Sequence, residues 1–270
     1  ADALQSGTTD THGRQSALGA IGAVWMRHFR VWLSIFVPAI VSGVGNPVFF
    51  LFAFGFGLGA VIDEVNGMPY LVFVVAGMIC NAALFQASFE ASIPSYTRLR
   101  VQRTYEAMLA APIGFNELVL GEILWAASKG MLSAVCLYVI GYFVGAIPDV
   151  PAALATLPLV AIGCMAFASF GLMMTAFAKT YEFFSYFFVF WIAPSLLFCG
   201  VFVDYARYPD WVQHITFFYP IRHLIDAIRP IIGGAPVDIA ATAGHMAYIV
   251  VFFLICTMLA TRRLKARLFD

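Results

Sequence analysis

Charged residues are scarce in this sequence. Only 11% of its residues are Asp, Glu, Lys or Arg, whereas a soluble domain carries about 25%. Hydrophobic residues make up 62%, and the mean hydropathy is +0.88. Basic and acidic residues balance, and a net charge of zero gives no sign of a nucleic-acid partner. This composition predicts an integral membrane protein.

Several motifs of nucleotide, catalytic and metal sites are missing. No GxxxxGKS or GxxxxGKT phosphate loop occurs, so the chain cannot bind ATP by that route, and no GxSxG nucleophile motif occurs. The glycines of GFGLG, residues 55–59, lie in an apolar stretch and favour close helix packing or a flexible helix end. The cysteines lack CxxC spacing. We expect no catalytic residue, no metal and no cofactor bound by this chain.

Six stretches are long and apolar enough to cross a membrane, which takes about 20 residues. They cover about 32–61, 70–93, 123–146, 152–178, 183–203 and 243–261. Before them, residues 16–31 carry an apolar stripe, which predicts a helix in the membrane interface; the alternative is an early extension of the first span, kinked at Pro38. The predicted fold is all-α, with one transmembrane domain over residues 16–270 after a disordered cytoplasmic tail, residues 1–15.

Basic residues gather on one side of the predicted membrane. Six spans place both termini on the same side, which also holds eleven of the fifteen basic residues: Arg14, Arg27, Arg30, Arg98, Arg100, Arg103, Lys179, Arg262, Arg263, Lys265 and Arg267. Three more lie opposite, at Arg207, Arg222 and Arg229. Because cytoplasmic loops are rich in Lys and Arg, both termini are predicted to be cytoplasmic.

The segment RTYEAMLAAPI, residues 103–113, lies on this side between the second and third spans. Thr104 is a candidate N-cap, and Pro112 discourages continuation of the helix. The apolar side chains of this short helix share one face: Tyr105, Met108 and Leu109. Because so short a helix is marginal alone, we expect the membrane surface or a separate cytoplasmic protein to cover that face.

Two charged residues, Glu90 and Lys129, fall inside predicted spans, towards their cytoplasmic ends. Charge within the membrane is costly and faces a partner or a cavity. Snorkelling or an ion pair between the two is favoured over a proton relay, because no other acidic residue lies near a bilayer midpoint.

The connection between the fifth and sixth spans is apolar but interrupted by prolines, which predicts two short helices dipping into the outer leaflet. His214, His223 and Asp226 lie in it, and a metal or acid–base site is conceivable there. Polar groups of half-buried helices at the lipid boundary are the favoured interpretation.

Aromatic residues dominate YEFFSYFFVFW, residues 181–191. Part of this run could line a substrate path, because acyl chains and sugars pack well on aromatic faces. The path candidates are Tyr181, Phe184, Tyr186, Phe187 and Trp191. Packing against lipid is slightly favoured.

The order of these parts resembles the membrane subunit (permease) of a type-2 ABC exporter. Two stretches carry the resemblance: QRTYEAMLAAPI followed by NELVLGEILWA, and FCGVFVDYARYPDWVQHITFFYPIRHLIDAIRP. The first stretch, with VNGMPYLVFVVAGMIC and GFGLGA, is similar to the nodulation-factor exporter permeases typified by NodJ. The second is similar to type-2 exporter permeases in general.

The resemblance implies a coupling helix around residues 103–112 that docks into a groove of a separate ATPase. The implied coupling residues are Arg103, Thr104, Tyr105, Glu106, Met108, Leu109 and Pro112, with the three apolar side chains filling the groove. It also implies a homodimer of this permease in the bacterial inner membrane, with two ATPase copies that bind ATP and Mg. An outer gate is implied at Trp211, Phe218, Tyr219, Pro220, His223, Asp226 and Arg229.

The cargo implied by the resemblance is a glycolipid, a lipo-oligosaccharide or a lipid-linked saccharide. Export of a drug or a phospholipid by the same architecture is the alternative. A membrane transferase that uses His214, His223 and Asp226 is less favoured, because the chain lacks a nucleophile motif.

Overall fold

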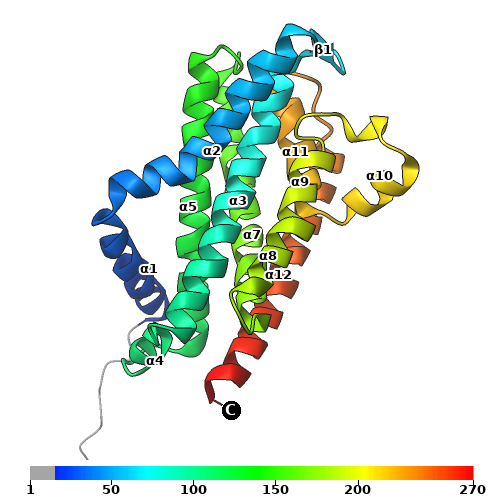
Figure 1. Ribbon diagram of the computed structural model, residues 1–270. Helices are drawn as coiled ribbons and strands as arrows, with labels where there is room; N and C mark the ends of the chain where they lie inside the picture. The colour runs from blue at the N-terminus through cyan, green and yellow to red at the C-terminus, as the bar shows by residue number, and fades with distance from the viewer. Residues whose placement is uncertain (1–15, 270) are drawn as a thin grey trace, which may run out of the picture.

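The computed structural model describes residues 16–269, apart from the side chains of residues 40, 42, 44 and 46. Regular structure in this range is almost entirely helical (Figure 1). The predicted all-α class is confirmed. The predicted tail, residues 1–15, lies outside the described residues.

The first two helices are separate elements. Helix α1 (Ala17–Leu33) is capped by Ser16, whose hydroxyl accepts the amide N–H of Gly19 at 3.2 Å. Helix α2 (Phe36–Gly57) starts after a turn and runs in a different direction (Figure 1). The alternative prediction, a single helix that continues into the first span and is kinked at Pro38, is therefore wrong. Pro38 lies in the first turn of α2, where proline is tolerated.

A small hairpin follows the 3₁₀ turn η1 (Leu58–Ala60). Strands β1 (Glu64–Val65) and β2 (Met68–Pro69) pair antiparallel around Asn66 and Gly67. These two residues have φ of 53° and 74°, the left-handed backbone that a two-residue asparagine–glycine turn adopts. The Asn66 amide donates to Asp204 at 2.6 Å, which ties the hairpin to the connection before α12.

Helix α3 (Tyr70–Arg100) is the centre of the bundle, and 89% of its most apolar window is buried. It packs against α5 (Phe115–Phe143) and α7 (Leu157–Phe177), which follows the short α6 (Val150–Ala155). A Cβ on Gly171 of α7 would lie 2.6 Å from the Ser88 carbonyl oxygen. Glycine is required at this position because the two helix backbones touch.

Helix α12 (Ile239–Phe269) covers α7 from outside, and only 17% of its most apolar window is buried. Its remaining surface is available to lipid. Near its end, Arg267 donates to the carbonyl oxygens of Thr175 at 3.1 Å and Ala176 at 3.0 Å. This guanidinium satisfies the open end of α7 and fixes the two helices together.

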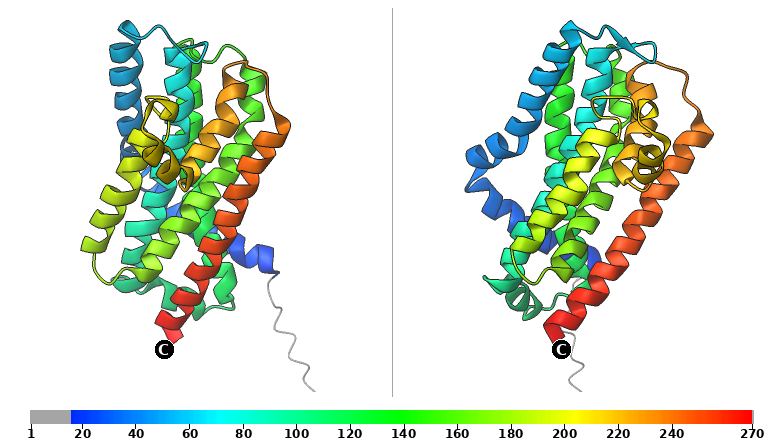
Figure 2. Two further views of the ribbon diagram at one scale, coloured as in Figure 1. Left: turned by 90° about the vertical axis from the view of Figure 1, so that its right-hand side faces the viewer. Right: turned by 45° about the vertical axis from the view of Figure 1, so that its right-hand side comes forward.

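The fifth apolar segment is one helix, Glu182–Phe198, with a π-helical turn in its middle. It consists of α8 (Glu182–Phe187), the π-helical turn η2 (Phe188–Ile192) and α9 (Ala193–Phe198). It is followed by the 3₁₀ turn η3 (Tyr205–Arg207), α10 (Asp210–Phe217) and α11 (Pro220–Ile232). Helix α11 packs on α12 and α3, whereas α10 stands out from the side of the bundle (Figures 1 and 2).

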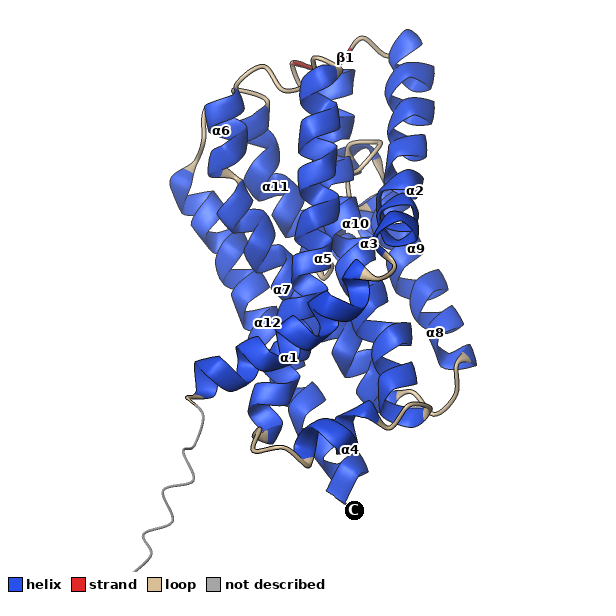
Figure 3. Cartoon of the chain, turned by 90° about the vertical axis from the view of Figure 1, so that its left-hand side faces the viewer, coloured by secondary structure: helices blue, strands red, loops and turns tan. Residues whose placement is uncertain are grey.

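The two ends of the bundle differ. One end holds α4 (Thr104–Leu109), the start of α1 and the end of α12, and the other holds the hairpin and α6 (Figure 3). Four helices of the described chain are long and apolar enough to cross a membrane: Tyr70–Arg100, Phe115–Phe143, Val150–Phe177 and Ile239–Phe269. The segments Pro47–Ala60 and Glu182–Phe198 are shorter apolar helices, so the six-span topology stays a prediction.

Candidate functional site

Buried charges join α3 and α5 near the α4 end of the bundle. The Glu90 carboxylate accepts three hydrogen bonds: from Arg98 at 3.1 Å, Lys129 at 2.8 Å and the Trp125 indole at 2.9 Å. Glu90 is 5% exposed. A carboxylate so buried needs such partners to stay charged. The structure thus pairs Glu90 with Lys129 and adds two donors that the sequence analysis missed.

A second carboxylate, Glu122, extends this cluster to α1. It accepts from Arg98 at 2.9 Å, from the Ser95 hydroxyl at 3.1 Å and from His28 Nε2 at 2.6 Å. Arg98 therefore bridges both carboxylates. We call Glu90, Arg98, Glu122 and Lys129, with His28, the ion network; it cross-links α1, α3 and α5.

Helix α4 sits directly beneath the ion network. Tyr105 is 1% exposed and Met108 is 7% exposed, and both belong to the main hydrophobic core. The Tyr105 hydroxyl is buried and makes no hydrogen bond to the described residues. Burial raises the pKa of Tyr105 well above its ordinary value, so the hydroxyl stays protonated.

The predicted outward orientation of this apolar face is therefore wrong for Tyr105 and Met108, while Leu109 is half-buried. The bundle itself covers the face, because Arg103 at the helix start has φ of 47° and turns the chain back under α3 and α5. Arg103 also takes the N-cap position expected for Thr104, which is itself buried.

The exposed surface of α4 carries charged side chains and small ones. It is formed by Arg103, Glu106, Ala107 and Ala110, with Pro112 exposed just beyond the helix. These side chains, rather than the apolar ones, are open to a second protein. The sequence pattern could not reveal this, because an apolar stripe predicts that a face is covered but not by which protein.

A pocket of about 680 Å³ opens beside the ion network, between α1, the start of α2, α3 and α5. Its polar wall includes Arg27, Arg98, Lys129 and Glu90, and its apolar wall includes Phe89. We call it the inner pocket. Hydropathy ends the second predicted span at residue 93 and begins the third at residue 123, which places Arg98 and Glu122 in the loop between them. The sequence therefore gives no sign of this pocket.

The aromatic run divides between two faces. Phe184 and Phe187 are buried, and Trp191 stacks on Tyr219 with ring centroids 4.3 Å apart. Tyr186 is 64% exposed. The run therefore does not form one continuous lining within this chain.

Tyr181 is exposed but held in place. Its hydroxyl lies 2.9 Å from the Thr97 hydroxyl, and its ring packs edge-on against Tyr96 at 4.9 Å. This contact fixes the start of α8 to the α4 end of α3.

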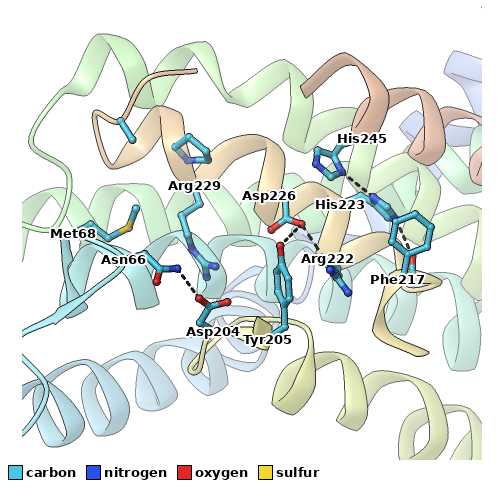
Figure 4. A pocket seen from close by; sticks show the side chains of 12 residues that line it. Asn66, Met68, Asp204, Tyr205, Phe217, Arg222, His223, Asp226, Arg229 and His245 are labelled. Atoms are coloured by element: carbon cyan, nitrogen blue, oxygen red, sulfur yellow. Dashed lines mark hydrogen bonds and ion pairs between the residues drawn. The ribbon is translucent and has the colours of Figure 1, made fainter. Parts of the chain in front are cut away.

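The opposite half of the bundle holds a polar pocket of about 370 Å³ (Figure 4). Within it, the Tyr205 hydroxyl donates to Asp226 at 3.2 Å, and Arg222 stacks over the Tyr205 ring at 3.7 Å. The Asp226 carboxylate lies 3.8 Å from Arg222. Burial raises the pKa of Asp226 above its ordinary value, although the positive charges of Arg229 and Arg222 oppose the shift. We call this the outer pocket.

Arg229 holds α11, which lines the outer pocket, against α3. Its guanidinium donates to the carbonyl oxygens of Phe73 and Gly200 and lies 3.7 Å from the Phe73 ring centroid. Burial lowers the pKa of Arg229 to about 10, which still leaves it charged at neutral pH. A charge this firmly bound acts as a structural anchor between α11 and α3.

The metal or acid–base site considered at His214, His223 and Asp226 is not assembled: His223 and Asp226 both line the outer pocket, whereas His214 does not. His214 Nδ1 bonds to the Asp210 carbonyl of its own helix at 2.6 Å, outside the outer pocket. His223 instead contacts His245, with the two Nδ1 atoms 2.9 Å apart. The described residues contain no group of three or more His, Cys, Asp or Glu suited to a metal.

The tautomer of His223 follows from its contacts. Its Nε2 lies 2.8 Å from the Phe217 carbonyl oxygen, which can only accept, so Nε2 carries a proton. Burial lowers the pKa of His223, and the neutral ring then accepts from His245 at Nδ1. His245 gave no sequence signal, since it lies in the following helix.

The remaining gate candidates take two positions. Trp211 and Phe218 are each 67% exposed, at or just after α10, whereas Tyr219 and Pro220 are buried at the start of α11. Only the second pair touches the bundle interior. The gate candidates thus do not form a single surface.

Comparison with known proteins gives consistent matches along the chain. The family model described as "ABC-2 type transporter" matches residues 19–233. "Nodulation protein J" of Rhizobium meliloti (strain 1021) is 35% identical over 244 residues, covering 90% of this chain and 93% of that protein. The protein of the same name in Rhizobium leguminosarum bv. viciae is 36% identical, with 90% and 94% coverage. "Inner membrane transport permease YadH" of Escherichia coli (strain K12) is 25% identical, with 90% and 95% coverage.

Proposed function

Since the chain belongs to the ABC-2 type transporter family and resembles its Nodulation protein J members, we propose that it is the membrane half of an exporter driven by a separate ATPase. Members of this family are transport subunits of the inner membrane rather than enzymes, and membership implies an ATPase partner.

We propose six spans with both termini in the cytoplasm. The α4 end of the bundle carries most of the basic residues outside the spans, among them Arg100, Arg103, Arg262 and Arg263. Cytoplasmic loops carry such an excess. In this orientation α2 and the helix Glu182–Phe198 complete the six spans, and α1 lies in the cytoplasmic interface.

Contact with the ATPase is proposed at α4, and the position of this helix is the observation that carries the proposal. Its buried side, with Tyr105, rests on the ion network, while Glu106 and Ala107 face away from the bundle. Movement of α4 by a docked protein would therefore reach α1, α3 and α5 together. ATP and Mg would be bound by the partner, because the chain lacks a phosphate loop.

The conduit is proposed to lie between two copies of this chain. Two elements expose large apolar side chains that their own bundle leaves uncovered: Phe49, at 76% exposed, on α2, and Phe190, at 70%, on the helix Glu182–Phe198. A surface that faces lipid also exposes apolar side chains. The proposed dimer is therefore supported by the family resemblance together with these exposed faces. Two ATPase copies would then complete the assembly.

The proposed cargo is a glycolipid, a lipo-oligosaccharide or a lipid-linked saccharide. Its support is the similarity to proteins named Nodulation protein J over nine-tenths of the chain. ATPase activity of the assembled complex distinguishes this cargo from a phospholipid or a drug. A lipo-oligosaccharide should stimulate the activity, whereas a phospholipid or a hydrophobic cation should not.

A matched pair of charge reversals tests the coupling proposal. Glu106→Lys alters the exposed face of α4, and Glu64→Lys alters another exposed glutamate, in the hairpin at the opposite end. We expect Glu106→Lys to weaken recovery of the ATPase with the tagged chain by about tenfold, as loss or repulsion of an interface charge does. Glu64→Lys should leave recovery unchanged.

The same pair is then compared for ATP-dependent export in reconstituted vesicles. A loss of export in Glu106→Lys alone supports docking at α4. Equal recovery of the ATPase with both variants, or export by the chain with no ATPase present, would refute the proposal.

A further inference from the structure

We propose that the inner pocket binds an anionic amphiphile from the adjacent membrane leaflet. Its phosphate or carboxylate head group would meet the basic wall, and its hydrocarbon chain would lie along the apolar wall. This inference rests on the proposed function for its orientation in the membrane, and it adds a site and a ligand class to it.

The charge around the pocket favours an anion. Three permanent cations, Arg27, Arg98 and Lys129, line it, against one lining carboxylate, Glu90. Counting Glu122, which lies behind the wall and bonds Arg98, leaves three cations against two carboxylates. Arg27 is exposed and is bonded to neither carboxylate. The surplus positive charge therefore lies at the open side of the pocket.

The carboxylates of the ion network are neutralised within the wall. Glu90 and Glu122 each accept three hydrogen bonds, and Arg98 bonds both of them. The charge that these contacts leave without a counter-charge is that of the exposed Arg27. An anionic head group would supply the missing counter-charge.

The other wall selects an amphiphile rather than a small ion. It is formed by Val31, Ile35, Phe85, Phe89 and Ile93. A free phosphate would leave these side chains uncovered. An acyl chain from the leaflet would cover them while staying in an apolar environment. With α1 in the interface, the basic wall lies at the level of lipid head groups.

Binding is measured on the full chain in detergent by native mass spectrometry. The probe is dioleoylphosphatidylglycerol, and dioleoylphosphatidylcholine is the control lipid with the same chains and no net charge. We expect one phosphatidylglycerol to be retained in preference to phosphatidylcholine. Arg27→Gln should weaken its affinity about fivefold, the effect of one basic residue near a membrane surface.

A further variant separates this site from general surface attraction. Arg30→Gln removes another exposed arginine of α1, one that does not line the pocket, and it should change nothing.

Three results would overturn the inference: equal retention of the two lipids, equal loss of affinity in Arg27→Gln and Arg30→Gln, or displacement of the lipid by inorganic phosphate at comparable concentration. The last would mark a site for a free anion. Because the measurement involves neither ATPase nor transport, its failure and the failure of the export proposal can be told apart.

Discussion

Replacing Tyr105 with alanine should release α4 from the bundle while the spans stay folded. The ring is almost wholly buried, and deleting an aromatic side chain from such a site costs about 3–5 kcal/mol. Helix α4 has only six residues, too few to be stable by itself. A loss of 3 kcal/mol is a factor of about 150 in the equilibrium between docked and detached α4, so the fraction of molecules with α4 detached should rise steeply.

Two measurements check this outcome. Hydrogen–deuterium exchange should show lost protection of the α4 amides in Tyr105→Ala, with protection in α3 and α5 retained. In the assembled complex, ATP hydrolysis should continue without export, because a detached α4 cannot move the ion network.

Tyr105→Phe is the matched control. It keeps the ring and removes a hydroxyl that has no hydrogen-bond partner in the described residues, so we expect unchanged or slightly higher stability and normal coupling. The reasoning would be refuted if Tyr105→Ala kept both its α4 protection and its export activity, or if Tyr105→Phe were equally harmful.

Two further predictions concern the ion network and the outer pocket. Glu90→Gln leaves Lys129 without its counter-charge and should cost about 3 kcal/mol, the lower end for a broken buried pair, seen as a melting temperature lower by about 6–12 °C. The double variant with Lys129→Gln should recover part of this loss, and additive losses would contradict the pairing. Because burial lowers the pKa of His223, its neutral form is favoured on folding, so its contribution to stability is complete above the unfolded pKa and is lost as pH falls below it. Melting temperatures at pH 7.5 and pH 5 should differ less in His223→Gln than in the parent chain, and an unchanged difference would remove His223 as the titrating group.

The sequence identified several residues of the candidate site but did not show which residues they contact. Glu90 and Lys129 stood out because charge is rare inside apolar spans. Their partners Arg98 and Glu122 did not, since hydropathy marks the limits of the hydrocarbon and α3 and α5 continue beyond it. His245 was likewise invisible, because only the packing of α12 against α11 brings it to His223.

The sequence by itself determined that this chain is a helical membrane protein with a short amphipathic helix at the end that is rich in Lys and Arg. Those properties follow from composition, from the length of apolar runs and from the distribution of Lys and Arg, all of which act locally along the chain. Only the tertiary structure decided that Tyr105 and Met108 face inward, that one arginine joins two carboxylates, and that a pocket opens beside them. Such outcomes depend on how separate helices meet, and the periodicity of a single helix shows which face is buried without showing what buries it.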